Sequence, residues 1–238
     1  MMVDSKVDYD ISNLYIPKDG KGDIDYQKSF IATLTIIVRD KDGKVIKKYK
    51  QKSHSPTANF IGIMLPYTWY AMTGNEWTLT TTSNTTFNYY QQLTGLFYGI
   101  GYPNNSWGVP NYIQNILVGS GSNSNPYSAY NLNAPISNGS GTGQLIYGSI
   151  NIPSNITING NQAYFIISQS YTNQSGATID ITEVGIVLYF TVYTSETPGY
   201  GGSGSSGSLL VWYDVLSSPI SVANGQQVVI YYTFSVNA

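Results

Sequence analysis

The feature that most restricts the fold of this chain is a series of short strand-like runs that fills its second half. From Ile113 onward, β-branched and aromatic residues gather in runs that clusters of Gly, Pro, Asn and Ser separate, and no long helical pattern interrupts them. This spacing is typical of an antiparallel sandwich or jelly roll. The predicted strands are 116–118, 144–152, 163–172, 179–190, 209–215 and 227–236.

The first fifty residues follow a different pattern. Residues 1–28 mix carboxylates and lysines with few large apolar groups, which predicts an extended arm that orders only against a partner. A β-hairpin follows, with an apolar strand at 30–38, turn residues at 40–43 and a charged strand at 44–52. The lysines of the second strand are typical of an exposed sheet edge.

Several shorter signals complete the predicted fold. Ser55 and Pro56 predict the start of a short helix that ends before Pro66, and residues 76–82 predict a short strand. Residues 198–208 are rich in Gly and Ser and predict a flexible tip between two antiparallel strands. We therefore expect an all-β, jelly-roll type sandwich with an arm, a hairpin and one short helix. The expected division is a charged part, 1–55, and a sandwich body, 56–238.

The charges of the chain are divided unevenly along it. All eleven Lys and Arg residues lie between Lys6 and Lys52, so residues 1–55 carry a net charge of +3. The rest carries only carboxylates and has a charge of −5. Without a cation, that part has no side chain suited to grip a phosphate, a carboxylate substrate or a nucleic-acid backbone. Those five carboxylates are Glu76, Asp180, Glu183, Glu196 and Asp214.

The composition also sets expectations about environment. The chain has no cysteine, so neither disulfides nor thiolate metal sites can form. Its polarity comes mostly from Asn, Ser, Thr, Gln and Tyr, which predicts tolerance of acid and an acidic or otherwise harsh extracellular setting. The N-terminus shows no apolar signal segment. We expect synthesis in the host cytoplasm and release within a particle, with no cofactor and no metal.

One cluster of basic residues is the candidate assembly interface. If the strand 44–52 alternates, three of its lysines share one face and can meet an acidic protein surface, a nucleic acid or an anionic lipid. Protection of a sheet edge by lysine explains the same cluster without any partner. The candidate residues are Arg39, Lys44, Lys47, Lys48, Lys50 and Lys52.

Acidic groups give no catalytic or metal site by spacing alone. Asp180 and Glu183 lie three residues apart on a predicted strand, so alternation places them on opposite faces, which does not suit joint acid–base catalysis. Asp19, Asp23 and Asp25 lie close together in the arm but complete no EF-hand loop. We interpret them as a solvated acidic stretch.

Other motifs have simpler explanations. Gly202, Gly204 and Gly207 match the spacing of a dinucleotide fingerprint, but a strand and not a helix is predicted after them. His54, the single histidine, fits the polar start of a helix. Five Asn-X-Ser/Thr sequences permit glycosylation and do not establish it. They begin at Asn84, Asn104, Asn138, Asn155 and Asn173.

The arrangement of segments resembles a known family. The hairpin IIVRDKDGKVIKKYKQKSHSP is followed by ILVGSGSNSNPYSAYNLNAPI, GTGQLIYGSI, TNQSGATIDITEVGI and LLVWYDVLSSPISVANGQQVVIYYTFSV. Together these resemble minor structural proteins of viruses and proviruses of thermophilic archaea, with relatives in some tailed phages. The likeness covers about residues 30–65 and 113–238. It implies a virion component and carries over no catalytic residue.

The leading hypothesis is therefore a non-enzymatic virion protein of a capsid, turret, spike or tail. Its expected partners are other virion proteins and copies of itself, with host-surface contact left open and nucleic acid expected only at the basic hairpin. Two alternatives remain. One is an archaeal cell-surface filament subunit joined by strand addition from its N-terminal arm. The other is a carbohydrate-binding or hydrolytic sandwich that uses exposed aromatic residues such as Trp69, Trp77 and Trp107.

Overall fold

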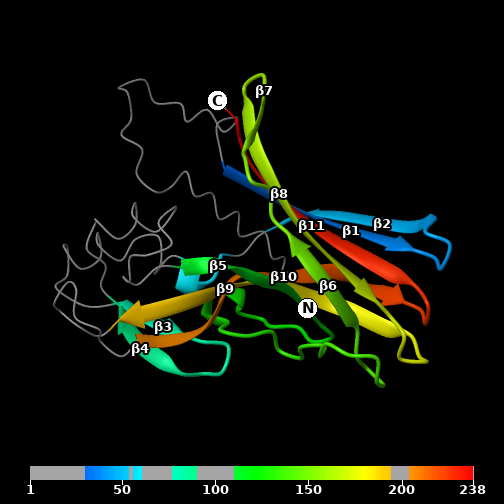
Figure 1. The fold of residues 1–238 in the computed structure, drawn as a ribbon, viewed down its shortest axis with the longest axis horizontal. Helices are drawn as coiled ribbons and strands as arrows, with labels where there is room; N and C mark the ends of the chain where they lie inside the picture. The colour runs from blue at the N-terminus through cyan, green and yellow to red at the C-terminus, as the bar shows by residue number, and fades with distance from the viewer. Residues whose placement is uncertain (1–29, 54–55, 61–76, 90–109, 194–203, 238) are drawn as a thin grey trace. The chain divides into compact units, whose positions relative to one another are not determined.

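The computed structural model describes residues 30–53, 56–60, 77–89, 110–193 and 204–237. This part of the chain is mostly β, with antiparallel sheets of six and three strands and a separate two-stranded ribbon (Figure 1). The all-β prediction is confirmed at this level. The strands are β1 (Phe30–Arg39), β2 (Val45–Lys52), β3 (Trp77–Thr80), β4 (Thr86–Tyr89), β5 (Pro110–Gly119), β6 (Ile146–Asn151), β7 (Thr157–Asn159), β8 (Gln162–Thr172), β9 (Ile179–Tyr193), β10 (Gly204–Val222) and β11 (Gln227–Asn237), with a 3-10 helix, η3, at Pro126–Ser128.

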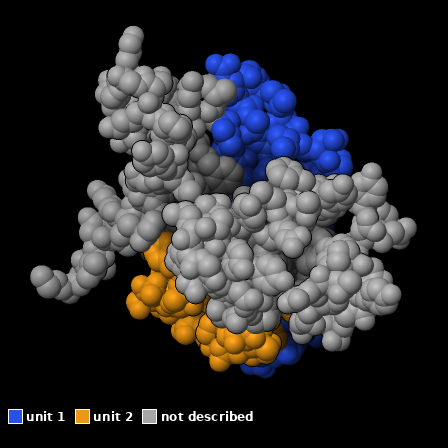
Figure 2. Space-filling model, turned by 90° about the vertical axis from the view of Figure 1, so that its left-hand side faces the viewer, with its two compact units in different colours: residues 1–54, 138–179, 222–238 blue, residues 55–137, 180–221 orange. Residues whose placement is uncertain are grey.

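The chain divides into two compact units, and each consists of separate segments of the sequence (Figure 2). Unit 1 comprises residues 1–54, 138–179 and 222–238, and unit 2 comprises residues 55–137 and 180–221. The six-stranded sheet belongs to unit 1, whereas the three-stranded sheet and the β3–β4 ribbon belong to unit 2. The sequence predicted a different division, at residue 55, from the distribution of charge along the chain. That division stays a prediction.

In unit 1 the strand order is β2-β1-β11-β8-β6, with β7 paired to β8. Every second residue of β1 is buried, as expected for a strand with one face in the core. The register brings these residues level with buried residues of β11 and β8, so one face of the sheet forms a continuous apolar layer. Its most buried members are Leu34, Ile36, Val38, Ile167, Tyr171, Val228, Ile230 and Tyr232.

Two sequence predictions about strands need correction. The alternation in 163–172 predicts a strand covered on both faces, but Ile166 is 38 % exposed, and only the face that carries Ile167 and Tyr171 is buried. The flexible tip predicted at 198–208 is also too long, because β10 begins at Gly204. β10 continues through Pro219 as an outer strand of its sheet, a position that tolerates a residue without a backbone N–H.

The predicted short helix begins later than expected. Ala58, Asn59 and Phe60 are helical, and the predicted continuation to Leu65 lies outside the described residues. Pro56, predicted at the first helical position, forms a β-bridge with Trp212 of β10. The extended backbone at Pro56 therefore delays the start of the helix.

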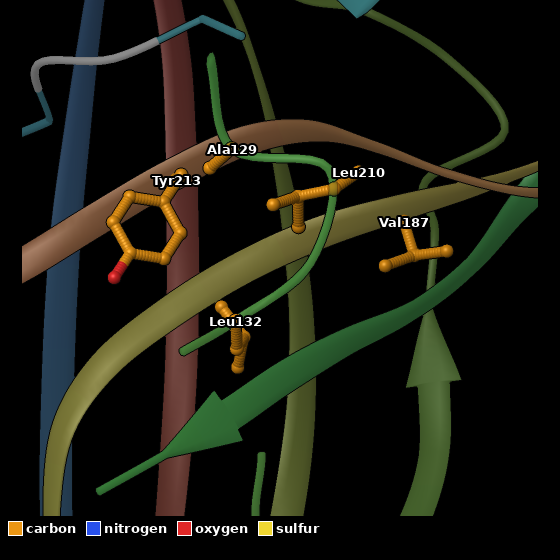
Figure 3. Close-up of a cluster of buried hydrophobic side chains, with 5 residues drawn as sticks. All are labelled: Ala129, Leu132, Val187, Leu210 and Tyr213. Atoms are coloured by element: carbon orange, nitrogen blue, oxygen red, sulfur yellow. The ribbon is translucent and has the colours of Figure 1, made fainter. Parts of the chain in front are cut away.

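The core of unit 2 contains a cluster to which a loop contributes. Ala129 and Leu132, which follow η3, pack with Val187 of β9 and with Leu210 and Tyr213 of β10 (Figure 3). In this view the Tyr213 hydroxyl lies on the side of the ring away from Leu210 and Val187. The cluster leaves that hydroxyl at its rim, where a polar group can reach it.

Candidate functional site

The basic cluster lies on the β1–β2 hairpin, whose turn is fixed by Asp40. One Asp40 carboxylate oxygen accepts hydrogen bonds from the backbone N–H groups of Asp42, at 3.0 Å, and Lys44, at 2.9 Å. Gly43 adopts the left-handed conformation that the turn requires, with φ at 82°. The predicted hairpin is confirmed, and its turn sets the register of β2 against β1.

Three lysines of β2 form a row on one face. The register pairs Lys48 with Ile37, Lys50 with Thr35 and Lys52 with Thr33. Directly opposed residues share a face, and the buried residues of β1 are the alternate ones, so this row lies on the outer face of the sheet. All three side chains are exposed. We call Lys48, Lys50 and Lys52 the lysine row.

The other three candidate residues lie elsewhere on the hairpin. Lys47 is level with buried Val38 and so belongs to the opposite face, while Lys44 lies in the turn. Arg39 donates a hydrogen bond from Nη1 to the Gly43 carbonyl oxygen at 2.9 Å. The structure therefore brings together half of the proposed interface residues, and the interface role of all six stays a prediction.

The lysine row is a local concentration of like charge. Residues two apart on a strand are separated by about 7 Å, so neighbouring ammonium groups in water repel by about 0.6 kcal/mol. Their cross-strand neighbours on β1, Ile37, Thr35 and Thr33, are neutral. β2 is also the outermost strand on this side of the described sheet (Figure 1). An acidic surface beside Lys48 and Lys50 would relieve the repulsion between these two.

A second polar centre, missed by the sequence analysis, surrounds Glu183 in unit 2. This β9 residue is 0 % exposed. Its carboxylate accepts hydrogen bonds from the backbone N–H groups of Ala134 (2.7 Å), Asn133 (3.0 Å) and Gly121 (3.2 Å) and from the Tyr213 hydroxyl. Four donors therefore compensate the burial of one charge, as a buried carboxylate requires.

These bonds close a loop whose two ends meet at Glu183. The Ser120 N–H donates to the Ala134 carbonyl at 2.9 Å, and Gly119 bridges to Pro135. A Cβ at Gly121 would lie 2.8 Å from the Ala134 nitrogen and 2.9 Å from a Glu183 carboxylate oxygen, while one at Gly119 would lie 2.7 Å from the Ala134 carbonyl oxygen. Both glycines of the Gly-Ser-Gly sequence are thus needed for the close approach of backbone and carboxylate.

The environment of Tyr213 differs from that of an ordinary tyrosine. Burial, followed by the hydrogen bond to Glu183 and the negative charge of Glu183, raises the pKa of Tyr213 far above its usual value. The phenol therefore remains a hydrogen-bond donor at any physiological pH. Asp180 is exposed whereas Glu183 is buried, so the prediction that these two carboxylates lie on opposite faces is confirmed.

A third polar centre, at Asn173 in unit 1, lies in one of the glycosylation sequences. Asn173 is 0 % exposed, and its amide nitrogen donates to the carbonyl oxygens of Ala177 and Val222, each at 2.7 Å. Its side-chain oxygen accepts from Ser175, and its backbone bonds to Gln226 and Gly225. Asn173 thus joins the β8–β9 turn to the β10–β11 turn, and its amide is not accessible to a glycosylating enzyme.

The remaining glycosylation and aromatic candidates fall into two groups. Asn84, Asn138 and Asn155 are exposed, whereas Asn104 lies outside the described residues. Trp69, Trp107 and the side chain of Trp77 also lie outside them, so the sugar-stacking proposal for these residues stays a prediction. Trp212, which is described, is only 3 % exposed.

Most of the metal, cofactor and histidine candidates lie outside the described residues. Asp19, Asp23, Asp25, His54 and Gly202 lie outside the described residues, while Gly204 and Gly207 belong to β10. The dinucleotide fingerprint requires a helix after its glycines, and the structure has the strand β10 there. In the described ranges, no group of three or more His, Cys, Asp and Glu side chains is arranged to hold a metal ion. Over the same ranges, no helix has the length and apolar character needed to span a membrane.

Comparison of the chain with protein-family models, with curated proteins and with solved structures found no match.

Proposed function

We propose that this chain is a non-enzymatic structural protein of a virion, a component of a capsid, turret, spike or tail. It contacts other virion proteins and copies of itself through the hairpin of unit 1. The observation that carries this proposal is the lysine row on β2, the outermost strand on this side of the described sheet, where exposed cations face outward and their cross-strand neighbours on β1 are neutral. The jelly-roll form of the sandwich and the virion location belong to this proposal.

The distribution of charge supports an assembly role for the hairpin. Because all cations of the sequence precede Ser53, only this end of the chain can attract an acidic neighbour. A sheet edge also offers backbone donors and acceptors to a neighbouring strand. Charge and hydrogen-bonding capacity therefore coincide at β2, which suits a contact that is repeated many times in a particle.

The burial and the hydrogen bonds of Glu183 also support a structural role for the chain. A catalytic carboxylate must reach substrate, but this one is fully buried and already accepts four hydrogen bonds from its own unit. These bonds hold a loop in place. The carboxylate thus contributes to the rigidity of unit 2, a property that a building block requires.

One observation favours a second candidate, a cell-surface filament subunit joined by strand addition. Among the described residues β2 is the outermost strand on its side of the sheet, a position where a donated strand can pair. A filament and a virion component share this contact, and they differ in the particle that contains the chain. Electron microscopy of particles from the native host, with mass spectrometry of their proteins, separates the two.

The test of the assembly role uses two single variants of equal charge change. Lys50→Glu inverts the charge at the centre of the lysine row, whereas Lys41→Glu changes only the turn, outside the six candidate interface residues. We expect the full chain to form large species at high protein concentration in sedimentation velocity, the row variant to lose them and the turn variant to retain them. A chain that stays monomeric alone and with acidic proteins of the same particle, or that hydrolyses a polysaccharide, would contradict the proposal.

A further inference from the structure

Three Asn-Gly pairs occur in the chain, and all of them lie in the described ranges. An asparagine is chemically labile before glycine, because the glycine has no Cβ to hinder the attack of its backbone nitrogen on the asparagine side-chain amide. The attack needs a backbone N–H that can lose its proton and a side chain that can turn toward the nitrogen. Hydrogen bonds to either group therefore protect the pair. The three pairs are Asn138-Gly139, Asn159-Gly160 and Asn224-Gly225.

The first pair, Asn138-Gly139, is held at both reacting groups. The Asn138 side-chain oxygen accepts a hydrogen bond from the Tyr147 backbone N–H at 3.0 Å. The Gly139 N–H donates to the Leu145 carbonyl oxygen at 3.0 Å. Both bonds must open before the Gly139 nitrogen can reach the side-chain amide. The structure thus protects this pair although Asn138 is exposed.

The third pair, Asn224-Gly225, is held in the same way. The Asn224 side-chain oxygen accepts a hydrogen bond from the Gly176 N–H at 3.0 Å. The Gly225 N–H donates to the Asn173 carbonyl oxygen at 2.7 Å. Because Asn173 is itself buried and bonded to both adjoining turns, this contact belongs to the polar centre of unit 1. Attack at Asn224 therefore requires that centre to open locally.

The middle pair, Asn159-Gly160, lacks this protection. Asn159 is the last residue of β7 and pairs with Gln162 of β8, so Gly160 is the first residue of a two-residue turn in the β7–β8 hairpin (Figure 1). In such a hairpin the N–H of the first turn residue lies outside the ladder. Within the described part of the chain, neither the Asn159 side chain nor the Gly160 N–H makes a hydrogen bond, and both residues are exposed.

We propose that Asn159 converts to aspartate and isoaspartate in the folded chain, while Asn138 and Asn224 persist. A base such as hydroxide removes the Gly160 amide proton, the nitrogen bonds to Cγ of Asn159, and ammonia leaves from the resulting five-membered succinimide. Water then opens this ring. Opening at the side-chain carbonyl gives aspartate, and opening at the backbone carbonyl gives isoaspartate. Each conversion consumes one water and releases one ammonia, without oxidation or reduction.

The conversion changes the hairpin and leaves the sheet in place. Either product adds a carboxylate to residues 77–179, which contain no charged side chain. Isoaspartate also adds one carbon to the backbone after residue 159, so the pair with Gln162 cannot keep its geometry and β7 should separate from β8. β8 remains paired with β11 along its whole length. The inference does not depend on the proposed function, because it concerns the chemistry of the folded chain alone.

Incubation in water labelled with ¹⁸O measures the reaction at each pair. The full chain is kept at mildly alkaline pH, either folded or unfolded in guanidinium chloride, and is returned to ordinary water before digestion. Only conversions that occur during the incubation then carry the label. Chymotrypsin cleaves after tyrosine and gives three peptides that each contain one Asn-Gly pair. These peptides are 131–147, 148–164 and 214–231.

The expected result is a difference between the pairs that exists only in the folded chain. Peptide 148–164 should gain label at a rate within about three-fold of its rate in the unfolded chain, because no hydrogen bond of the pair must open. Peptides 131–147 and 214–231 should gain label at least about ten-fold more slowly when folded, since two hydrogen bonds of ordinary strength must open in each.

A conservative variant assigns the label to one residue. Asn159→Gln keeps the side-chain amide, but its attack would have to close a six-membered ring, which is much slower. We expect this variant to lose most of the label in peptide 148–164 and to leave the other two peptides unchanged. The control is needed because Asn151, Asn155 and Asn161 lie in the same peptide.

Three outcomes overturn the inference. The first is a folded chain in which peptide 148–164 is slowed as much as the other two. The second is label that persists in this peptide after Asn159→Gln, which assigns the reaction to another asparagine. The third is faster labelling at Asn138 or Asn224 than at Asn159 in the folded chain. None of these outcomes bears on the proposed assembly role, which the charge variants of the hairpin test separately.

Discussion

The two units of this chain hold their backbone together in different ways. In unit 1, long ladders join β1, β11 and β8 in continuous register, and alternate residues build one apolar layer. In unit 2, a three-stranded sheet supports a loop that a single side chain, Glu183, fixes through three backbone N–H groups. Regular pairing supplies the hydrogen bonds in the first case, and buried polar side chains supply them in the second.

The difference teaches where single substitutions should matter. A ladder distributes its hydrogen bonds over many residues, so loss of one side chain leaves the backbone pairs in place. A loop fixed by one carboxylate depends on that residue, because its removal leaves several buried donors unsatisfied at once. Unit 2 should therefore be sensitive to polar substitutions, and unit 1 mainly to changes in its apolar face. All four tryptophans of the sequence fall in unit 2, so their fluorescence reports on that unit.

The largest effect is expected for Glu183→Ala. The substitution leaves three backbone N–H groups and the Tyr213 hydroxyl without an acceptor in a buried site. We expect a loss of about 3–5 kcal/mol in the free energy of unfolding, measured by urea titration with tryptophan fluorescence. Glu183→Gln, which keeps one acceptor oxygen, should lose less.

Asp180→Asn is the matched control for Glu183. It removes a carboxylate from the same strand at an exposed position, and its effect should stay within about 0.5 kcal/mol. Equal losses at both positions would show that net charge, and not the hydrogen bonds of the loop, determines the stability of unit 2.

Asn173 is the exception that can break the comparison, because it gives unit 1 a polar centre of its own. Asn173→Asp replaces an amide donor by an oxygen that faces the carbonyls of Ala177 and Val222. We expect a loss of about 2–4 kcal/mol, since two buried acceptors lose their donor. The measurement is hydrogen exchange of the peptides that cover β8 and β11. Asn224→Asp, at an exposed position in the adjoining turn, is the control.

A pH titration of stability sharpens the comparison further. Burial raises the pKa of Tyr171 in unit 1 and of Tyr213 in unit 2, so both phenols stay neutral in the folded chain after they ionise in the unfolded chain. Their contribution is complete below pH 10 or so and declines above it, by about 1.4 kcal/mol per pH unit for each group. Tyr213→Phe should reduce the decline seen by tryptophan fluorescence above pH 10 and leave that of unit 1 unchanged. An unaltered fluorescence profile in this variant would contradict the assignment.

The smallest effect is expected at the edge of unit 1. Lys50→Gln removes one exposed cation of the lysine row and should change the free energy of unfolding by no more than about 0.5 kcal/mol. Circular dichroism during urea titration provides the measurement. A larger loss of free energy of unfolding would mean that Lys50 stabilises the fold itself, which would argue against a role in assembly alone.

Much of the fold could be predicted because alternation is a local signal. The hairpin, β8 and β11 appear in the sequence within a residue or two of their observed bounds. The start of β10 was wrong because Gly and Ser have low strand propensity, yet the chain is extended from Gly204. Pro56 was placed in a helix because its bridge to Trp212 depends on a residue far along the sequence.

The sites were predicted unevenly for the same reason. The lysine row follows from alternation in one strand, so the sequence was sufficient to place Lys48, Lys50 and Lys52 on one face. The partners of Glu183 come from a loop some fifty residues earlier, and no local pattern joins them. One signal existed, because alternation places Glu183 on the same face as Ile181 and Val187, where a charge must find donors.

The position of β11 between β1 and β8 has a consequence for biosynthesis. β1 leaves the ribosome well before β11, the strand that pairs along its whole length. The β1–β2 hairpin can form early, but the apolar face that β1 shares with β11 remains incomplete until β11 has been synthesised, since contacts between distant segments form late. A nascent chain that stalls before residue 227 therefore exposes that face to chaperones and to other unfinished copies.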